Sequence, residues 1–242
     1  MKRDQLRRGV IVSCQAVEGD PFYGSELMAT MALAAEIGGA VGLRINSAPD
    51  IVSVKKKVSL PVIGILKRHY ANSLAYITPT IVEVEEVINA GADIVCIDGT
   101  GSIKPDGKTT EQFIQTIKAR FDVPVMADVA TAEEGVAAWR AGADLLATTL
   151  AGYEHYLQNP QNYDPADNFR DPDYEIVREL AHQVSIPVLA EGRFWTPEQI
   201  IHAMELGAYS VVVGSAITRP QLITQRMARA VDDFLQGSEQ VC

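Results

Sequence analysis

Eight short apolar runs recur along the 242 residues, and each is followed by a segment with helical periodicity. The runs are almost continuously hydrophobic, which is typical of strands buried on both faces of a parallel sheet. We place the strands near residues 10–15, 41–46, 61–67, 93–98, 123–128, 144–149, 187–191 and 209–214. Strands that alternate with helices in this number predict an α/β fold, a single (β/α)₈ or TIM barrel over residues 1–242.

The ends of the expected elements carry a finer repeat. Three odd-numbered strands begin with a Pro-Val pair at equal intervals, and the even-numbered ones begin with Gly-Ala. Glycine there ends the preceding helix, and proline opens a strand where its missing N–H costs little. Four helices begin with a capping-box pattern, in which a threonine is followed three residues later by Glu or Gln: Thr80, Thr109, Thr131 and Thr196.

Polar side chains stand at the predicted carboxyl ends of the strands, where this fold holds its catalytic residues. These residues are Gln15, Arg44, Lys67, Asp98, Asp128, Thr149 and Glu191. On strands 2 to 7 each lies an even number of residues from the proline or alanine that begins its strand. Side chains alternate sides along a strand, and an unpaired charge against the helix layer is costly. We therefore expect these side chains to point inward and ring one site, although one of them alone would more often be a solvated rim residue.

The segments after strands 7 and 8 have the residues expected of a phosphate site. Gly192 and Arg193 follow strand 7, and Gly214, Ser215 and Arg219 follow strand 8. Loops at these two positions often hold phosphate in this fold, through backbone N–H groups and the start of a short helix. Glycine also serves in ordinary tight turns, but the joint position of these residues favours phosphate binding.

Charge and hydropathy exclude several kinds of partner. The net charge is −10 and the isoelectric point is near 4.9, which disfavours nucleic acid and anionic membranes, because both require a basic surface. No apolar run approaches the ~20 residues that cross a bilayer. The oligomeric state is open on this evidence, and we carry a homodimer forward as an arrangement to test.

The metal-binding residue types form no recognisable site. The three cysteines, Cys14, Cys96 and Cys242, are an odd number without ligand spacing, which indicates reduced thiols in a cytoplasmic protein. The four histidines are His69, His155, His182 and His202, and they do not cluster at strand ends. We expect no metal and no cofactor.

Seven segments together resemble bacterial N-acetylmannosamine-6-phosphate 2-epimerases, and the resemblance runs from about Gly9 to Phe234. They are residues 11–16, 39–46, 60–68, 126–131, 148–153, 190–193 and 216–220. The resemblance implies that Lys67 is the acid/base at the sugar C2 and that Glu191 is essential. It also implies that Gln15, Arg44, Asp128 and Arg219 contact a phosphorylated amino sugar, and that no cofactor is needed. Arg193 differs from the asparagine of some relatives, and the segment 151–172 is longer than usual.

The implied reaction sets a requirement on the lysine. Epimerisation at C2 removes a proton α to the C1 carbonyl of the open-chain sugar and returns it on the other face. Lysine can take that proton near neutral pH only if desolvation or neighbouring positive charge lowers its pKa, and Arg44 and Arg68 are candidates for that influence. Glu191 could move protons at the hydroxyls during ring opening.

Two other functions remain open at this stage. The chain could be another phosphate-binding barrel enzyme, similar to ribulose-phosphate epimerases or to indole- or thiazole-forming synthases, because fold alone does not separate these. It could also be a sugar-phosphate sensor without catalysis, although the presence of Lys67 and Glu191 argues against this.

Overall fold

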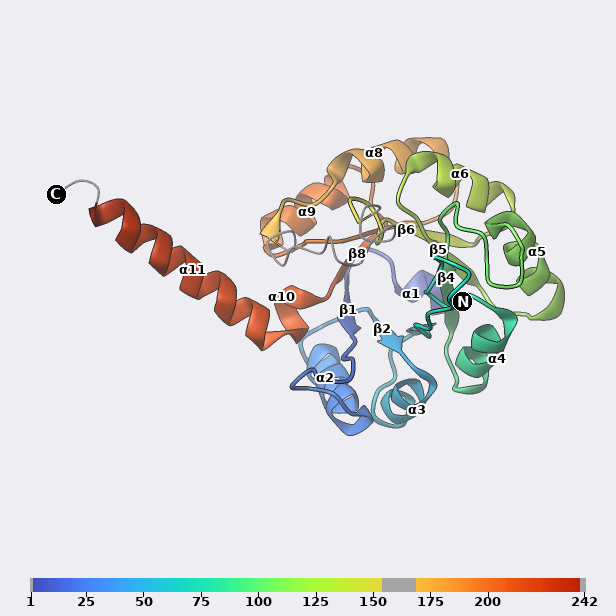
Figure 1. Cartoon of the computed structure of the whole chain (residues 1–242), viewed down its shortest axis with the longest axis horizontal. Coiled ribbons are helices and arrows are strands. Elements are labelled where there is room, and N and C mark those ends of the chain that lie inside the picture. Colours follow the sequence, from blue (N-terminus) through green and yellow to red (C-terminus); the bar gives the residue numbers. More distant parts are fainter. Residues whose placement is uncertain (1, 154–168, 240–242) are drawn as a thin grey trace.

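Eight parallel strands close into a barrel in the order of the chain, so that β1 is hydrogen-bonded to both β2 and β8 (Figure 1). The computed structural model describes residues 2–153 and 169–239. The strands are β1 (Val10–Cys14), β2 (Gly42–Asn46), β3 (Val62–Ile65), β4 (Ile94–Asp98), β5 (Val125–Asp128), β6 (Leu145–Ala147), β7 (Val188–Glu191) and β8 (Ser210–Val213). The predicted TIM barrel is confirmed.

Four strands end earlier than the sequence pattern predicts, and β8 is one of them, since it ends at Val213 rather than Gly214. Gln15, Lys67 and Thr149 all lie beyond the last residue of their strands. Lys67 instead forms an isolated antiparallel bridge with Ile77. The polar residues at the barrel mouth leave the ladder because they make contacts with loops and side chains there instead.

A ring of helices surrounds the barrel (Figure 1). The helices of the described residues are α1 (Lys2–Gln5), α2 (Ser25–Ile37), α3 (Ala48–Lys57), α4 (Ile81–Asn89), α5 (Thr110–Arg120), α6 (Ala132–Arg140), α8 (Tyr174–Gln183), α9 (Pro197–Glu205), α10 (Ser215–Thr218) and α11 (Pro220–Glu239), and α1 and α11 lie outside the ring. All four predicted capping boxes are present, at Thr80, Thr109, Thr131 and Thr196. Each supplies acceptors for backbone N–H groups that the first turn of a helix leaves unpaired.

Two layers of apolar side chains fix the barrel. The inner layer includes Ile63, Ile65 and Cys96, and Leu6 lies beneath it at the amino ends of the strands. The outer layer, between strands and helices, includes Leu43 and Ile45. Because Arg44 lies between two outward residues, it points inward, as the alternation predicts. One end of the barrel is closed by Leu6, and the polar strand ends gather at the other.

The last helix departs from the ring. α11 projects away from the barrel (Figure 1). Its apolar residues Met227, Val231 and Leu235 are 66%, 58% and 54% exposed. Near its start Arg226 lies over the ring of Trp195, at 4.9 Å from the centroid. Exposed apolar side chains gathered in this way are typical of surfaces that contact a partner.

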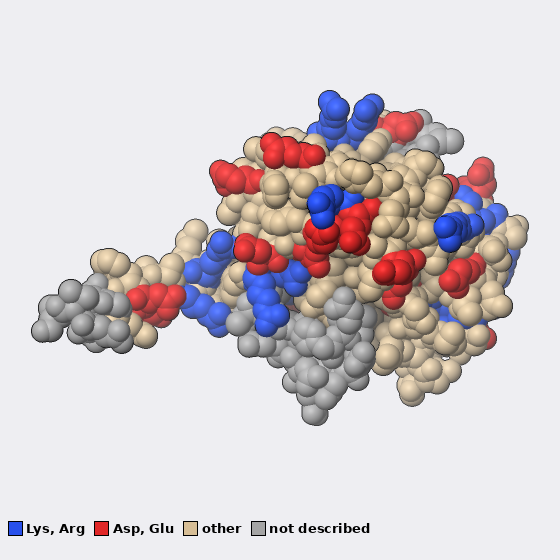
Figure 2. All heavy atoms as spheres, turned by 90° about the horizontal axis from the view of Figure 1, so that it is seen from above, with Lys and Arg blue, Asp and Glu red and all other residues tan. Residues whose placement is uncertain are grey.

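The surface charge is mixed. Figure 2 shows acidic and basic side chains interspersed over one face of the molecule, without a continuous basic area. Among the described residues, no helix is both long and apolar enough to cross a bilayer.

Candidate active site

A cavity of about 710 Å³ opens at the carboxyl ends of the strands. This volume suits a small organic ligand. Nine of the sequence-predicted site residues line it: Gln15, Lys67, Thr149, Glu191, Gly192, Arg193, Gly214, Ser215 and Arg219. The other two, Arg44 and Asp128, are buried and contact the residues of the cavity wall.

Arg44 joins three neighbouring polar side chains. Its guanidinium donates to Thr149 Oγ1 at 2.9 Å, and it also donates to the carboxylates of Glu191 and Asp128. Thr149 Oγ1 donates to Asp128 Oδ1 at 2.7 Å. Arg44 Nε is buried and has no hydrogen-bond partner among the residues that the structure describes. The cluster thus places one cation between two carboxylates at the edge of the cavity.

Two members of this cluster line the cavity, Thr149 and Glu191, and Glu191 is the one that ionises. Burial raises its pKa, the Arg44 charge opposes that rise, and the neighbouring Asp128 adds to it, so that the net shift is upward. A raised pKa favours the protonated form of a carboxyl group, which is the form that can donate a proton. Glu191 thus lines the cavity with a raised pKa, and Asp128 lies buried beside it.

Lys67 comes from the opposite side of the barrel, since β3 and β7 are four strands apart in the closed order. Its side chain is exposed to the cavity, and its backbone N–H donates to Asn46 Oδ1 at 3.0 Å. The protein that surrounds the cavity removes the ammonium from bulk water, and Arg44 and Arg219 add positive charge. Together these effects lower the pKa of Lys67 to about 8. Lys67 is thus poised to act as a base.

Of the two arginines expected to influence Lys67, the structure supports one. Arg44 lowers its pKa, whereas Arg68 is not among the main influences. Arg68 instead pairs with Glu83 and Glu86 of α4, at 3.2 Å from Glu86 Oε1. Arg68, the other candidate, thus has its charge beside the carboxylates of α4.

The loops after β7 and β8 form a polar part of the cavity wall. Gly192 and Arg193 both have positive φ, +117° and +63°. Gly152 has a φ of +78°, a conformation that favours glycine, and it lies against the Arg193 guanidinium, since a Cβ there would be 2.6 Å from Arg193 Nη1. Arg193 Nη2 donates to the carbonyl of Ala151 at 3.3 Å, while its buried Nε has no partner in the described ranges. An arginine N–H at a cavity wall that has no partner in the described ranges can donate a hydrogen bond to an anionic ligand.

The loop after β8 leads directly into the short helix α10. Gly214 stands at the N-cap of this helix, and Ser215 begins it. Thr218 Oγ1 donates to the carbonyl of Ser13 at 3.0 Å, which fixes α10 against the end of β1. Arg219 follows directly and also lines the cavity. The backbone N–H groups and the guanidinium are therefore held at one side of the cavity.

The sequence reasoning missed the contribution of the loop between β3 and α4. This loop lines the cavity with His69, Tyr70, Ala71, Ser73, Leu74 and Tyr76. The rings of His69 and Tyr76 stack with centroids 5.3 Å apart. Burial and the nearby Asp128 and Asp98 raise the pKa of Tyr76, so its phenol stays protonated. The available signal was the unusual length of this segment, which contains two tyrosines and a histidine before Thr80.

Asp98 differs from the other strand-end residues. It is buried and does not line the cavity. Its carboxylate lies 3.5 Å from Lys104 Nζ. In residues 2–153 and 169–239, no three His, Cys, Asp or Glu side chains form a group that could hold a metal. His155 and most of the segment 151–172 lie outside these ranges.

Comparisons with known proteins agree on one family. Residues 28–233 match the family model described as "Putative N-acetylmannosamine-6-phosphate epimerase". Two proteins named "Putative N-acetylmannosamine-6-phosphate 2-epimerase" are similar over 95% of the chain. The one from Caldanaerobacter subterraneus subsp. tengcongensis is 50% identical over 93% of its own length. The one from Enterobacter sp. (strain 638) is 44% identical over 95% of its length.

A solved structure gives the same result. It is that of the N-acetylmannosamine-6-phosphate 2-epimerase from Clostridium perfringens, which is 40% identical in sequence. The TM-score is 0.85, and the match covers 94% of this chain and 95% of that one.

Proposed function

We propose that this chain, which belongs to the N-acetylmannosamine-6-phosphate epimerase family, interconverts N-acetylmannosamine 6-phosphate and N-acetylglucosamine 6-phosphate. The observation that carries this proposal is the position of Lys67. It is exposed in a cavity across from Glu191, with a lowered pKa of about 8, and the loops after β7 and β8 supply donors for a phosphate. The enzyme would be an isomerase of amino-sugar and sialic acid catabolism.

The chemistry follows from these side chains. Neutral Lys67 removes the C2 proton of the open-chain sugar, which is acidic because the C1 carbonyl lies next to it. Negative charge then develops on the C1 oxygen, and a hydrogen-bond donor or cation that lines the cavity would stabilise it. Glu191 transfers protons at the hydroxyls when the ring opens and closes. Lys67 then holds the proton as an ammonium. Delivery of a proton from this ammonium to the other face of C2 restores the C1 carbonyl and the neutral amine, which completes the epimerisation.

The remaining residues bind the substrate in this proposal. Gln15, Asp128 and Thr149 hold the sugar, directly or through Arg44 and Glu191. The phosphate is bound by Gly192, Arg193, Gly214, Ser215 and Arg219. No metal or other cofactor takes part in this scheme. A cytoplasmic location is part of the proposal, because the described cysteines Cys14 and Cys96 are free, buried thiols.

Incubation with N-acetylmannosamine 6-phosphate in D₂O tests the proposal. Proton NMR should show loss of the C2 signal and appearance of N-acetylglucosamine 6-phosphate that carries deuterium at C2. Tight binding of the phosphosugar without C2 exchange would instead indicate a sensor. If the protein neither binds the phosphosugar nor exchanges its C2 proton, the barrel has a different substrate.

A further inference from the structure

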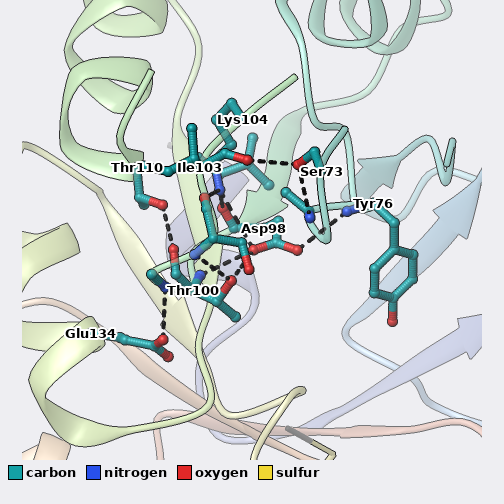
Figure 3. A network of polar contacts seen from close by, with 12 residues as sticks. Ser73, Tyr76, Asp98, Thr100, Ile103, Lys104, Thr110 and Glu134 are labelled. Carbon is teal, nitrogen blue, oxygen red and sulfur yellow. Dashed lines mark hydrogen bonds and ion pairs between the residues drawn. The ribbon is translucent and has the colours of Figure 1, made fainter. Parts of the chain in front are cut away.

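A buried ion pair lies beside the cavity without lining it. Lys104, in the loop between β4 and α5, is 1% exposed, and so is Asp98 at the end of β4 (Figure 3). Lys104 Nζ donates to the Asp98 carbonyl at 2.8 Å and to the Ser102 carbonyl at 3.3 Å. Removing two charges from water costs about as much as their attraction returns, so such a pair is weak evidence for stability. The segments that contact the pair are therefore the better guide to its role.

Two buried aspartates that neighbour each other in the sheet each have a cation of their own. Asp98 on β4 and Asp128 on β5 are neighbours in the register of the sheet. Lys104 is the cation beside Asp98, and Arg44 is the cation beside Asp128. The Arg44 guanidinium donates to both Asp128 and Glu191.

The Asp98 side chain and backbone also hold the loop that follows β3. The backbone N–H of Asp98 donates to the carbonyl of Ile77 at 2.8 Å. The Tyr76 N–H donates to Asp98 Oδ2 at 3.3 Å, on one side of the carboxylate (Figure 3). On the other side, Thr100 donates to Asp98 Oδ1 through its N–H at 3.1 Å and its hydroxyl at 2.7 Å. An apolar side chain in place of Asp98 would leave these buried donors unpaired.

Residues 76–78 in turn fix Lys67. Lys67 is paired with Ile77 in an antiparallel bridge. The residues on either side are bonded as well, since Arg68 N–H donates to the Tyr76 carbonyl and Thr78 N–H donates to the Leu66 carbonyl, both at 2.9 Å. A continuous series of contacts therefore leads from Lys104 through Asp98 and residues 76–78 to Lys67.

The same loop is attached to the Lys104 loop at a second place. Ser73 Oγ donates to the Ile103 carbonyl at 2.6 Å, and Asn72 Nδ2 donates to the Pro105 carbonyl at 2.9 Å. Gly101 N–H donates to Glu134 Oε1 of α6 at 2.8 Å, which ties the network to the rigid helix ring (Figure 3). The loop that carries the cavity-lining tyrosines is thus braced from the β4 side.

We propose that Lys104 and Asp98 are positioning residues, which hold Lys67 at its place in the cavity through residues 76–78. This inference rests on the proposed function, in which Lys67 takes the C2 proton. Misplacement of a catalytic group by about 1 Å can cost about 100-fold in rate, even when the mutation is remote.

Two substitutions test the role of the pair. Lys104→Met removes the cation with little change of shape, and Thr100→Val removes one hydrogen bond to Asp98 without any change of charge. We expect kcat and the C2 exchange rate to fall about 10- to 100-fold in Lys104→Met and about 3- to 10-fold in Thr100→Val. KM should change less than about threefold in both, because the phosphate loops lie across the barrel.

Lys55→Met is the matched control. Lys55 Nζ lies 2.8 Å from Asp93 Oδ2, and the same carboxylate accepts the N–H of Val62 at 2.9 Å. This pair joins α3 to the residue before β4, at the other end of the barrel. We expect its loss to leave kcat within about twofold, at temperatures where all variants are folded by circular dichroism.

A second measurement separates this proposal from the proposed function. The pH dependence of Lys67 acetylation by acetic anhydride, followed by mass spectrometry, gives the pKa of Lys67 without any substrate. We expect a value near 8 in the unmodified chain and a higher value, toward 10.5, in Lys104→Met and Thr100→Val. If the unmodified chain shows no C2 exchange, the proposed function fails. The acetylation result alone then decides whether Lys104 and Asp98 position Lys67. Folded variants with unchanged kcat and unchanged Lys67 acetylation would overturn the positioning role. If Lys104→Met does not fold, the result for Thr100→Val decides whether that role stands.

Discussion

At the scale of single residues, the base is the side chain on which the proposed reaction depends most. Lys67→Ala should lower kcat by at least about 10²–10⁴-fold, which is the typical contribution of a general base. Lys67→Arg should lose activity similarly, because a guanidinium does not deprotonate. Phosphosugar binding, measured by calorimetry, should persist, and C2 deuterium exchange should disappear. Exchange near the wild-type rate in Lys67→Ala would transfer the role of base to Glu191.

The pKa of Lys67 also predicts a pH profile. The value is lowered to about 8, and only the neutral amine accepts the C2 proton. Below pH 8 the neutral fraction falls with pH, so kcat/KM should drop about tenfold per pH unit on the acid side and level off above pH 8. Initial rates between pH 5.5 and 9.5, with a pH-independent coupling assay, measure this. A profile that is flat from pH 6 to 9 would contradict the assignment.

Alternation along strands predicted the direction of the site residues but not their partners. Arg44, Asp128 and Glu191 all point inward as expected. That the Arg44 guanidinium binds both carboxylates depends on lateral register between strands, which period-2 patterns do not contain. Lys104 was missed for a related reason. It lies in a loop, and nothing in the local sequence shows that its ammonium is buried against Asp98.

At the scale of elements, the loops after β7 and β8 predict dependence on the phosphate group. Gly192, Gly214, Ser215 and Arg219 line one side of the cavity. Unphosphorylated N-acetylmannosamine should therefore show a far lower kcat/KM than its 6-phosphate. Arg219→Ala should raise KM for the phosphosugar by about 10- to 100-fold, and leave the low activity on the unphosphorylated sugar nearly unchanged. Equal kcat/KM values on the two sugars would remove the phosphate assignment.

Element type was readable from the sequence, whereas the loops at the mouth were not. The four capping boxes carry their own signal, because a threonine and a Glu or Gln three residues later satisfy local donors. The β3–α4 loop has no such local rule. Its shape depends on contacts such as Ser73 with Ile103 and Tyr76 with Asp98, which join segments about 20 to 30 residues apart.

At the scale of the whole molecule, the arrangement of the potential metal-binding side chains predicts activity without a metal. The described residues contain no group of three His, Cys, Asp or Glu side chains that could hold one, and Glu191 and Asp128 are already paired with Arg44. Dialysis against EDTA should leave the epimerisation rate unchanged. A loss that added Mg²⁺ or Zn²⁺ restores would show that these carboxylates had been assigned to the wrong chemistry.

The sequence left a homodimer as an arrangement to test, and α11 provides a surface through which two chains could associate. α11 projects from the barrel, and Met227 and Val231 lie one turn apart on it, each more than half exposed (Figure 1). Apolar side chains are exposed on other helices too, Ile201 on α9 at 56% and Ile37 on α2 at 80%. Exposed apolar surface of this kind favours association, and two identical chains can cover it symmetrically.

We therefore expect a homodimer, with twice the 26.3 kDa of one chain in light scattering after size exclusion. Met227→Glu combined with Val231→Glu should shift the protein toward the monomer, because burying two carboxylates at an apolar contact is costly. Gln236→Glu is the control, since it adds a charge to the same helix at an exposed polar position and should leave the dimer intact. A wild-type protein that stays monomeric up to about 100 μM would contradict this prediction, because an obligate interface is stable well below that concentration.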